Sequence, residues 1–177
     1  MNSLSSFILH PSAFILSKMA LIELDTLIHA PAAVCFDLAR SIDLHVAAPS
    51  PLRHRAVAGV TSGFIGLGEE VTWAGSFLCV PQRMTSKIVA LEAARSFTDE
   101  MQSGPFKRWR HTHRFEPTDG GTLMRDHVEF ASPFGPLGSA FDAVFLKGFM
   151  TRVLLAHNSH LKAEAERRAA SLSEVIS

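Results

Sequence analysis

A long apolar segment near the end of the chain constrains the fold more than any other feature. Apolar side chains recur every three or four residues between residues 137 and 169, which is typical of one face of an α-helix. At about 1.5 Å per residue this helix would be roughly 50 Å long, longer than a small domain is wide. We expect its first two-thirds to pack on another surface and its charged end to extend into solvent. The predicted packing stripe, with Asp142 and Lys147 off its centre, consists of Phe141, Phe145, Phe149, Val153 and Ala156.

The hundred residues before this helix predict that surface, because they form short strand-like segments in series. The Asp-Gly-Gly sequence at 119–121 is a strong hairpin signal, and Pro81 is expected to end the strand before it. No helical pattern separates most of these segments, so neighbouring strands should pair antiparallel. The strand-like segments are 20–29, 53–60, 70–77, 83–91, 95–101, 106–115 and 122–131.

Two short helices are predicted between the first two strands. Pro31 suits the first turn of the first helix, over residues 31–40. Ser41 can cap a second helix that continues through His45 and ends before Pro49. On this short helix we expect His45 to lie on the surface, with the mouth of a cavity as the alternative position.

Length and composition indicate one domain. The chain has 177 residues, 47% of them hydrophobic, and no linker-like segment divides it. We place the domain at residues 19–170 and a flexible tail at 171–177. Residues 1–18 carry two short apolar runs without a targeting pattern, so we interpret them as a disordered extension or as the product of a start codon assigned too early. Neither run approaches the roughly 20 apolar residues of a membrane span.

Charge and cysteine content narrow the partners and the compartment. Seventeen basic residues balance seventeen acidic ones, which argues against nucleic acid as a partner. Cys35 and Cys79 lack metal-ligand spacing and are expected to be free, buried thiols of a cytoplasmic protein.

The order of strand, two short helices, antiparallel strands and one long helix resembles the SRPBCC superfamily of START-like, Bet v 1-like and polyketide cyclase/dehydrase-like proteins. The resemblance covers about residues 20–166 and is clearest at residues 58–73, 97–101 and 111–117. It implies an α+β helix-grip fold, in which a curved antiparallel sheet wraps around the long C-terminal helix. It also implies a cavity between sheet and helix that takes a small hydrophobic ligand. Because the superfamily includes carriers, receptors and enzymes, it does not fix the activity.

Period-two alternation places several polar side chains on the inner face of this sheet. In the segment 106–115, Trp109, His111 and His113 share one face with Phe115, and the arginines share the other. The same rule turns Asp99 and Asp126 inward. The candidate ligand-binding residues are Trp73, Phe77, Phe97, Asp99, Met101, Trp109, His111, His113, Met124, Asp126, Phe141, Phe145, Phe149 and Arg152.

Four interpretations of the inward polar groups are open. They can satisfy one another, as buried polar groups normally must. They can orient an amphipathic ligand, or act as general acid and base, with His111, His113 and Asp126 as the catalytic candidates. His-x-His on one face of a strand can also bind a metal, but no third ligand is identified, so we assign no metal ligands and expect no cofactor. Arg152 either pairs with an inward aspartate or reaches past the sheet edge.

The leading functional hypothesis is a non-enzymatic binder or carrier of a small hydrophobic or amphipathic molecule, lipid-like or polyketide-like. The main alternative is a cyclase/dehydratase-like enzyme acting on an aromatic or polyketide substrate. A third is an interaction module that uses the fold without a small ligand.

Overall fold

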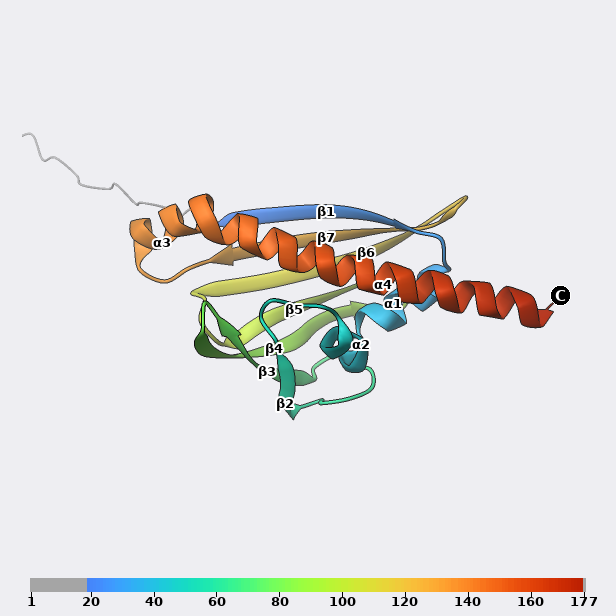
Figure 1. Ribbon diagram of the computed structural model, residues 1–177, viewed down its shortest axis with the longest axis horizontal. Coiled ribbons are helices and arrows are strands. Elements are labelled where there is room, and N and C mark those ends of the chain that lie inside the picture. Colours follow the sequence, from blue (N-terminus) through green and yellow to red (C-terminus); the bar gives the residue numbers. More distant parts are fainter. Residues whose placement is uncertain (1–18, 177) are drawn as a thin grey trace, which may run out of the picture.

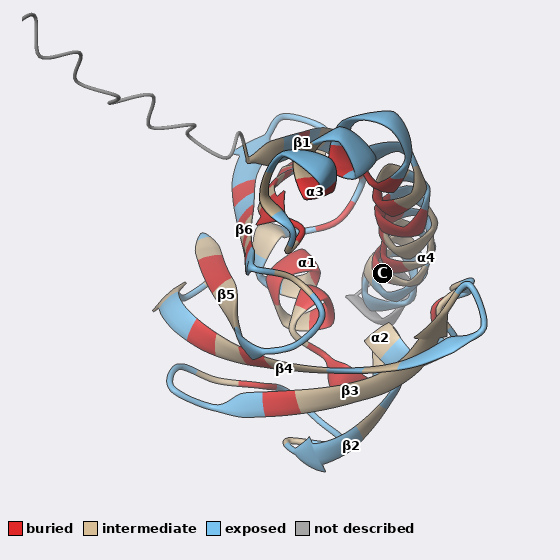
Figure 2. Ribbon diagram, turned by 90° about the vertical axis from the view of Figure 1, so that its left-hand side faces the viewer, coloured by how far each residue is buried: buried red, intermediate tan, exposed pale blue. Residues whose placement is uncertain are grey.

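The computed structural model of the protein describes residues 19–176. Within this range one antiparallel sheet runs in the order β1-β7-β6-β5-β4-β3-β2, which confirms the predicted antiparallel pairing. Figure 2 shows the sheet curving around the helices. The strands are β1 (Ala20–Ile28), β2 (Arg55–Gly59), β3 (Glu70–Phe77), β4 (Val80–Glu92), β5 (Ser96–Ser103), β6 (Arg108–Thr118) and β7 (Gly121–Ala131).

The helices cover the concave face of the sheet. The last three elements run on from one another and cross the sheet diagonally, while the two short helices lie beside the C-terminal half of the long one (Figure 1). This is the predicted helix-grip fold. The helical elements are α1 (Ala32–Ala39), α2 (Ile42–Ala47), α3 (Gly135–Phe141), the π-helical η1 (Asp142–Leu146) and α4 (Lys147–Ile176).

Local turn chemistry explains the element boundaries. Ser41 caps α2 as predicted, since its Oγ accepts a hydrogen bond from the Leu44 N–H at 3.3 Å. Gly121 completes the β6–β7 hairpin at φ +139°, where a Cβ atom would lie 2.2 Å from the Ile28 carbonyl oxygen. Pro81 does not end a strand: it lies within β4, opposite Ser76 of β3. It is tolerated there because the pairing of β4 with β5 begins only at Thr85.

The predicted packing face of the long helix is wrong by about one residue in its first turns, whereas Val153 of the predicted stripe is buried as expected. Phe141 and Phe145 are 41% and 39% exposed, whereas Asp142, placed off the centre of the stripe, is 1% exposed. Asp142 is held at the end of β7, where its carboxylate accepts hydrogen bonds from the Ser132 N–H at 2.8 Å and the Ser132 hydroxyl at 2.5 Å. The side chains buried against the sheet and α1 are Leu146, Met150, Val153, Leu154, Asn158, Leu161 and Ala165.

The charged end of the long helix packs further than expected. Leu161 and Ala165 are buried in the core formed with α1, and α4 contacts both α1 and β1. Glu166 accepts a hydrogen bond from the His29 N–H at 2.9 Å, and Lys162 bonds to Glu166. The prediction that this segment extends freely into solvent is therefore wrong up to about this point. α4 continues to Ile176, past the domain end expected at residue 170.

Strand faces follow the sequence alternation closely. Trp109, His111, His113 and Phe115 are all buried, while Arg108 and Arg114 are exposed. Two buried clusters result. One joins α1 and the C-terminal half of α4 to the sheet through residues such as Phe36 and Phe115, and the other joins β1, β6 and β7 to residues 146–154.

Three further expectations concern the cysteines, the membrane and the N-terminus. Both cysteines are free, but only Cys35 is buried; Cys79 is exposed in the β3–β4 turn, which corrects the prediction for that thiol. Among the described residues, no helix has the length and apolar character needed to cross a membrane. The predicted extension at 1–18 lies outside the described residues.

Candidate functional site

A cavity of about 650 Å³ lies between the inner face of the sheet and the helices α2, α3 and α4. Its wall draws on both buried clusters, with Ile88 and Phe97 from one and Leu146, Met150 and Leu154 from the other. The curvature of the sheet explains the space, because α4 packs on β1 while β3 and β4 bend away beneath it (Figure 2).

The structure brings together eight of the predicted ligand-binding residues and leaves six outside the lining. The cavity is lined by Trp73, Phe77, Phe97, Asp99, Trp109, His111, His113 and Phe141. Outside the lining are Met101, Met124, Asp126, Phe145, Phe149 and Arg152. Contact of any of these with a ligand stays a prediction.

The six residues outside the lining have clear positions. Met124 is fully buried in the core, and Met101 is partly buried beside the second cluster. Phe145 and Phe149 pack against Phe77, with ring centroids 6.3 and 5.0 Å away. Arg152 is exposed and its Nε donates to the Gly148 carbonyl, so it does not reach an inward aspartate.

The sixth, Asp126, lies behind the cavity wall and anchors its first polar group. One carboxylate oxygen, Oδ1, accepts a hydrogen bond from His111 Nε2 at 2.9 Å. The same oxygen is 2.7 Å from His113 Nδ1, although this contact lacks hydrogen-bond alignment. The other oxygen accepts a hydrogen bond from Asn158 Nδ2 of α4 at 2.6 Å. Asp126 thus ties both histidines of β6 to the long helix.

The two aspartates of this group have opposite electrostatic environments. Burial alone would raise the pKa of Asp126, but His113 and His111 more than offset it and hold that pKa well below its usual range. Asp99 faces the cavity with one oxygen 4.0 Å from His111 Nδ1. Burial raises the pKa of Asp99, and the nearby His111 and Trp109 only partly oppose this. The site therefore holds one firmly ionised carboxylate and one carboxyl group that burial shifts toward its protonated form.

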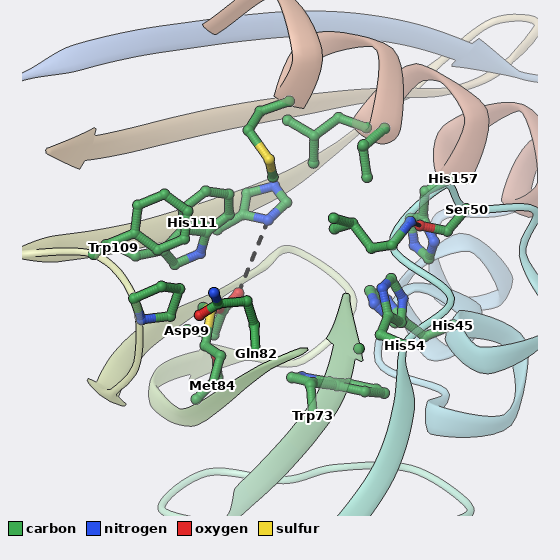
Figure 3. A pocket seen from close by; sticks show the side chains of 18 of the residues that line it. His45, Ser50, His54, Trp73, Gln82, Met84, Asp99, Trp109, His111 and His157 are labelled. Carbon is green, nitrogen blue, oxygen red and sulfur yellow. Dashed lines mark hydrogen bonds and ion pairs between the residues drawn. The ribbon is translucent and has the colours of Figure 1, made fainter. Parts of the chain in front are cut away.

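A second polar group, which was not predicted from the sequence, lies across the cavity from Asp99 and His111 (Figure 3). The His45 ring lies 4.7 Å from the His54 ring and 4.5 Å from the His157 ring, measured between centroids. Trp73 lies 4.5 Å from His45 on the same measure. The expectation that His45 is a surface residue is therefore wrong. His157 occurs four residues after Val153 of the predicted stripe, and this spacing was the one available signal.

The surroundings of these three imidazoles favour their neutral forms. Burial lowers the pKa of His157 to about 3, and repulsion from His113 adds to this effect while Asp126 opposes it. Burial, with His157 and His54, lowers the pKa of His45 well below its usual value, and burial also lowers the pKa of His54. A neutral imidazole offers one N–H donor and one acceptor, so this group can form directional hydrogen bonds to a ligand.

A curved antiparallel sheet that closes over a long helix, with a largely apolar cavity between them, defines a helix-grip domain. Residues 19–166 match the family described as polyketide cyclase / dehydrase and lipid transport. The chain belongs to this family. No curated protein sequence is significantly similar to it.

Solved structures confirm the fold at low sequence identity. The Zhui aromatase/cyclase from Streptomyces sp. R1128 is 18% identical, with a TM-score of 0.68 over 85% of this chain and 96% of that one. The protein TTHA0849 from Thermus thermophilus is 16% identical, with a TM-score of 0.65 over 87% and 99% of the two chains. The ginseng major latex-like protein 151 from Panax ginseng is 18% identical, with a TM-score of 0.61 over 83% and 97%.

Proposed function

We propose that the protein binds a small, largely apolar molecule that carries polar groups, and that it does so as a carrier or binding protein. The cavity is the observation that carries this proposal. Its volume of about 650 Å³ falls within the roughly 300–1,000 Å³ typical of small-molecule sites. Its wall is mostly apolar, and apart from Arg40 its charged and imidazole side chains gather in the two polar groups around His111 and His45. A ligand with hydrogen-bonding groups near both ends would use both.

The rim of the cavity supports this proposal. Phe134 and Leu137 line one edge and are 82% and 80% exposed, which is unusual for large apolar side chains. Such a rim offers an apolar ligand favourable contact as it leaves water and enters the cavity. The family description includes lipid transport, which fits a carrier. We also propose a cytoplasmic location, which the buried free thiol of Cys35 favours.

The decisive experiment is mass spectrometry of an organic extract of the denatured, purified protein, compared with two variants. Val153→Trp adds bulk at a cavity-lining position, and Val144→Trp makes the same change at a position that is 88% exposed. An apolar molecule should be recovered from the wild type and from Val144→Trp, and lost from a folded Val153→Trp. If no apolar molecule is recovered and titration with fatty acids or polyketides produces no shift, an interaction module without a small ligand becomes the better hypothesis.

A cyclase/dehydratase-like enzyme is the second candidate, and the hydrogen bond from His111 to Asp126 favours it. When Nε2–H of His111 donates its hydrogen bond to Asp126, the other ring nitrogen, Nδ1, lies on the cavity side, 4.0 Å from an Asp99 oxygen. An imidazole oriented by a carboxylate can remove a proton from a bound ketone. The family description names polyketide cyclases, which makes a polyketide the first substrate to test.

His111→Gln separates these two functions. If the ring only orients a ligand, affinity should fall by about 1–2 kcal/mol, the scale of one altered buried hydrogen bond. If the ring is a general base, turnover should fall by about a hundredfold or more while affinity changes little. Polyketide binding and turnover should therefore be measured together on the wild type and the variant. No turnover by the wild type would remove the enzyme hypothesis for that substrate.

A further inference from the structure

Three side chains at the cavity wall place metal-ligating atoms close together. Asp99 of β5 lies directly opposite His111 of β6, and His113 lies two residues further along β6 on the same face. One donor atom from each residue can be chosen so that all three lie within 4.8 Å of one another. A tetrahedral metal ion with bonds of about 2.1 Å needs its ligand atoms roughly 3.4 Å apart, so small side-chain rotations would close the site.

Asp126 supplies the outer support that histidine metal ligands normally have. A histidine that binds a metal through one ring nitrogen usually donates its other N–H to a carboxylate or carbonyl, which fixes the ring and its tautomer. His111 donates Nε2–H to Asp126 Oδ1 and so presents Nδ1 to the cavity side. His113 places Nδ1 2.7 Å from the same oxygen, so the carboxylate also lies beside the second ring, although this contact lacks hydrogen-bond alignment. Asn158 holds the other oxygen of Asp126 at 2.6 Å.

We infer that Asp99, His111 and His113 form a binding site for a divalent transition-metal ion, with Asp126 as the positioning residue behind the two histidines. Two imidazoles and one carboxylate suit Zn²⁺, Fe²⁺, Co²⁺ or Ni²⁺, whereas Mg²⁺ and Ca²⁺ prefer oxygen ligands alone. All three ligands line the cavity wall, so the remaining coordination positions face the cavity. Three protein ligands with an open position are typical of metal sites that bind a further small molecule.

This site does not depend on the proposed ligand binding. Its donors are fixed by the ladder between β5 and β6 and by the Asp126 network, whatever molecule fills the cavity. The sequence provided His-x-His on one face but no third donor. The register of β5 against β6 provides it, because that register sets Asp99 opposite His111.

The test is titration of the full chain, stripped with EDTA, with Zn²⁺ in a calorimeter and with Co²⁺ in a spectrophotometer. The wild type should take up one ion per chain and give the visible Co²⁺ bands of a four- or five-coordinate site. Asp99→Asn should weaken Zn²⁺ affinity by about 100-fold or more and change the Co²⁺ spectrum. Asp126→Asn should weaken affinity by roughly 10- to 100-fold, the usual effect of losing an outer carboxylate.

His54→Gln is the matched control, since it removes an imidazole from the other side of the cavity and should leave metal affinity unchanged. Circular dichroism establishes that each variant is folded, and Asp99→Asn should fold because Asp99 lies outside the hydrogen bonds made by Asp126. No stoichiometric uptake by folded wild type would overturn the inference, as would uptake that survives Asp99→Asn or is lost in His54→Gln. The organic ligand is extracted in the presence of EDTA, so the test of ligand binding does not depend on whether the metal ion binds.

Discussion

Asp126 is the residue on which the buried polar network depends. It is 2% exposed and accepts hydrogen bonds from a histidine of β6 and an asparagine of α4, so a single carboxylate connects the sheet to the long helix. Its low pKa means that folding stabilises the charged form. Removing this charge is therefore costly, because its buried partners would be left unpaired.

Asp126→Asn should therefore lower the free energy of unfolding at neutral pH by about 3 kcal/mol, because an amide nitrogen would then face donors that need an acceptor. Urea denaturation measures this change. Asp25→Asn on the outer face of β1 is the control: its ion pair with Arg125 is exposed at 3.7 Å and should contribute less than about 1 kcal/mol. Equal losses in the two variants would contradict the role given to Asp126.

At the scale of elements, the sequence predicted the strands, the two short helices and the inward faces of β6 and β7. These follow from period-two alternation and cap chemistry, which are local properties of the chain. The packing face of the long helix was not predictable in this way. The π-helical turn η1 inserts an extra residue per turn, and the bond from Ser132 to Asp142 turns a polar side chain inward. The prediction therefore placed the aromatic side chains of this helix against the sheet, whereas aliphatic side chains contact it.

The second polar group shows another limit of sequence reasoning. His45, His54 and His157 come from α2, the segment before β2, and α4, so only the tertiary fold brings them together. The position of Asp99 beside the histidines of β6 likewise depends on the tertiary fold. Alternation predicted its face, but only the register of β5 against β6 decided which residue it opposes.

The corrected helix face makes a stability prediction for two neighbouring residues. Leu146→Ala should cost about 3 kcal/mol, because Leu146 is 5% exposed and its removal leaves a hole against Trp109 and Phe130. Phe145→Ala should cost only about 1 kcal/mol, since that ring is 39% exposed and a fully buried phenylalanine would cost about 3–5 kcal/mol. Thermal or urea unfolding of both variants tests this order, and a larger loss at Phe145 would restore the original face assignment.

At the scale of the whole molecule, the family match begins at residue 19, which is also where we placed the start of the domain. We predict that a chain starting at Met19 unfolds with a free energy within about 1 kcal/mol of the full-length value, less than one typical damaging substitution. Parallel urea titrations of the two chains measure the difference. A larger loss would show that residues 1–18 pack on the domain.

Acid stability of the whole protein should depend on the histidines that line the cavity. His157 has a pKa of about 3 in the folded protein, against an ordinary value of 6.5, so the unfolded chain binds the proton more tightly. Its contribution to stability is complete above about pH 6.5 and is lost as the pH falls toward 3. His45 and His54 act in the same direction, whereas the raised pKa of Asp99 acts in the opposite one.

His157→Gln should therefore make the free energy of unfolding less sensitive to pH between about 6.5 and 5. The difference in slope from wild type should approach about 1.4 kcal/mol per pH unit, the value for one proton. Val153→Ala is the control because it changes a residue on the same cavity-facing side of α4 without removing a titrating group. It should lower the free energy of unfolding by the same amount at every pH. Urea titrations at a series of pH values give the slopes. An unchanged slope in His157→Gln would mean that this imidazole is not kept neutral by its burial, and that water or a ligand stabilises its charged form in the cavity.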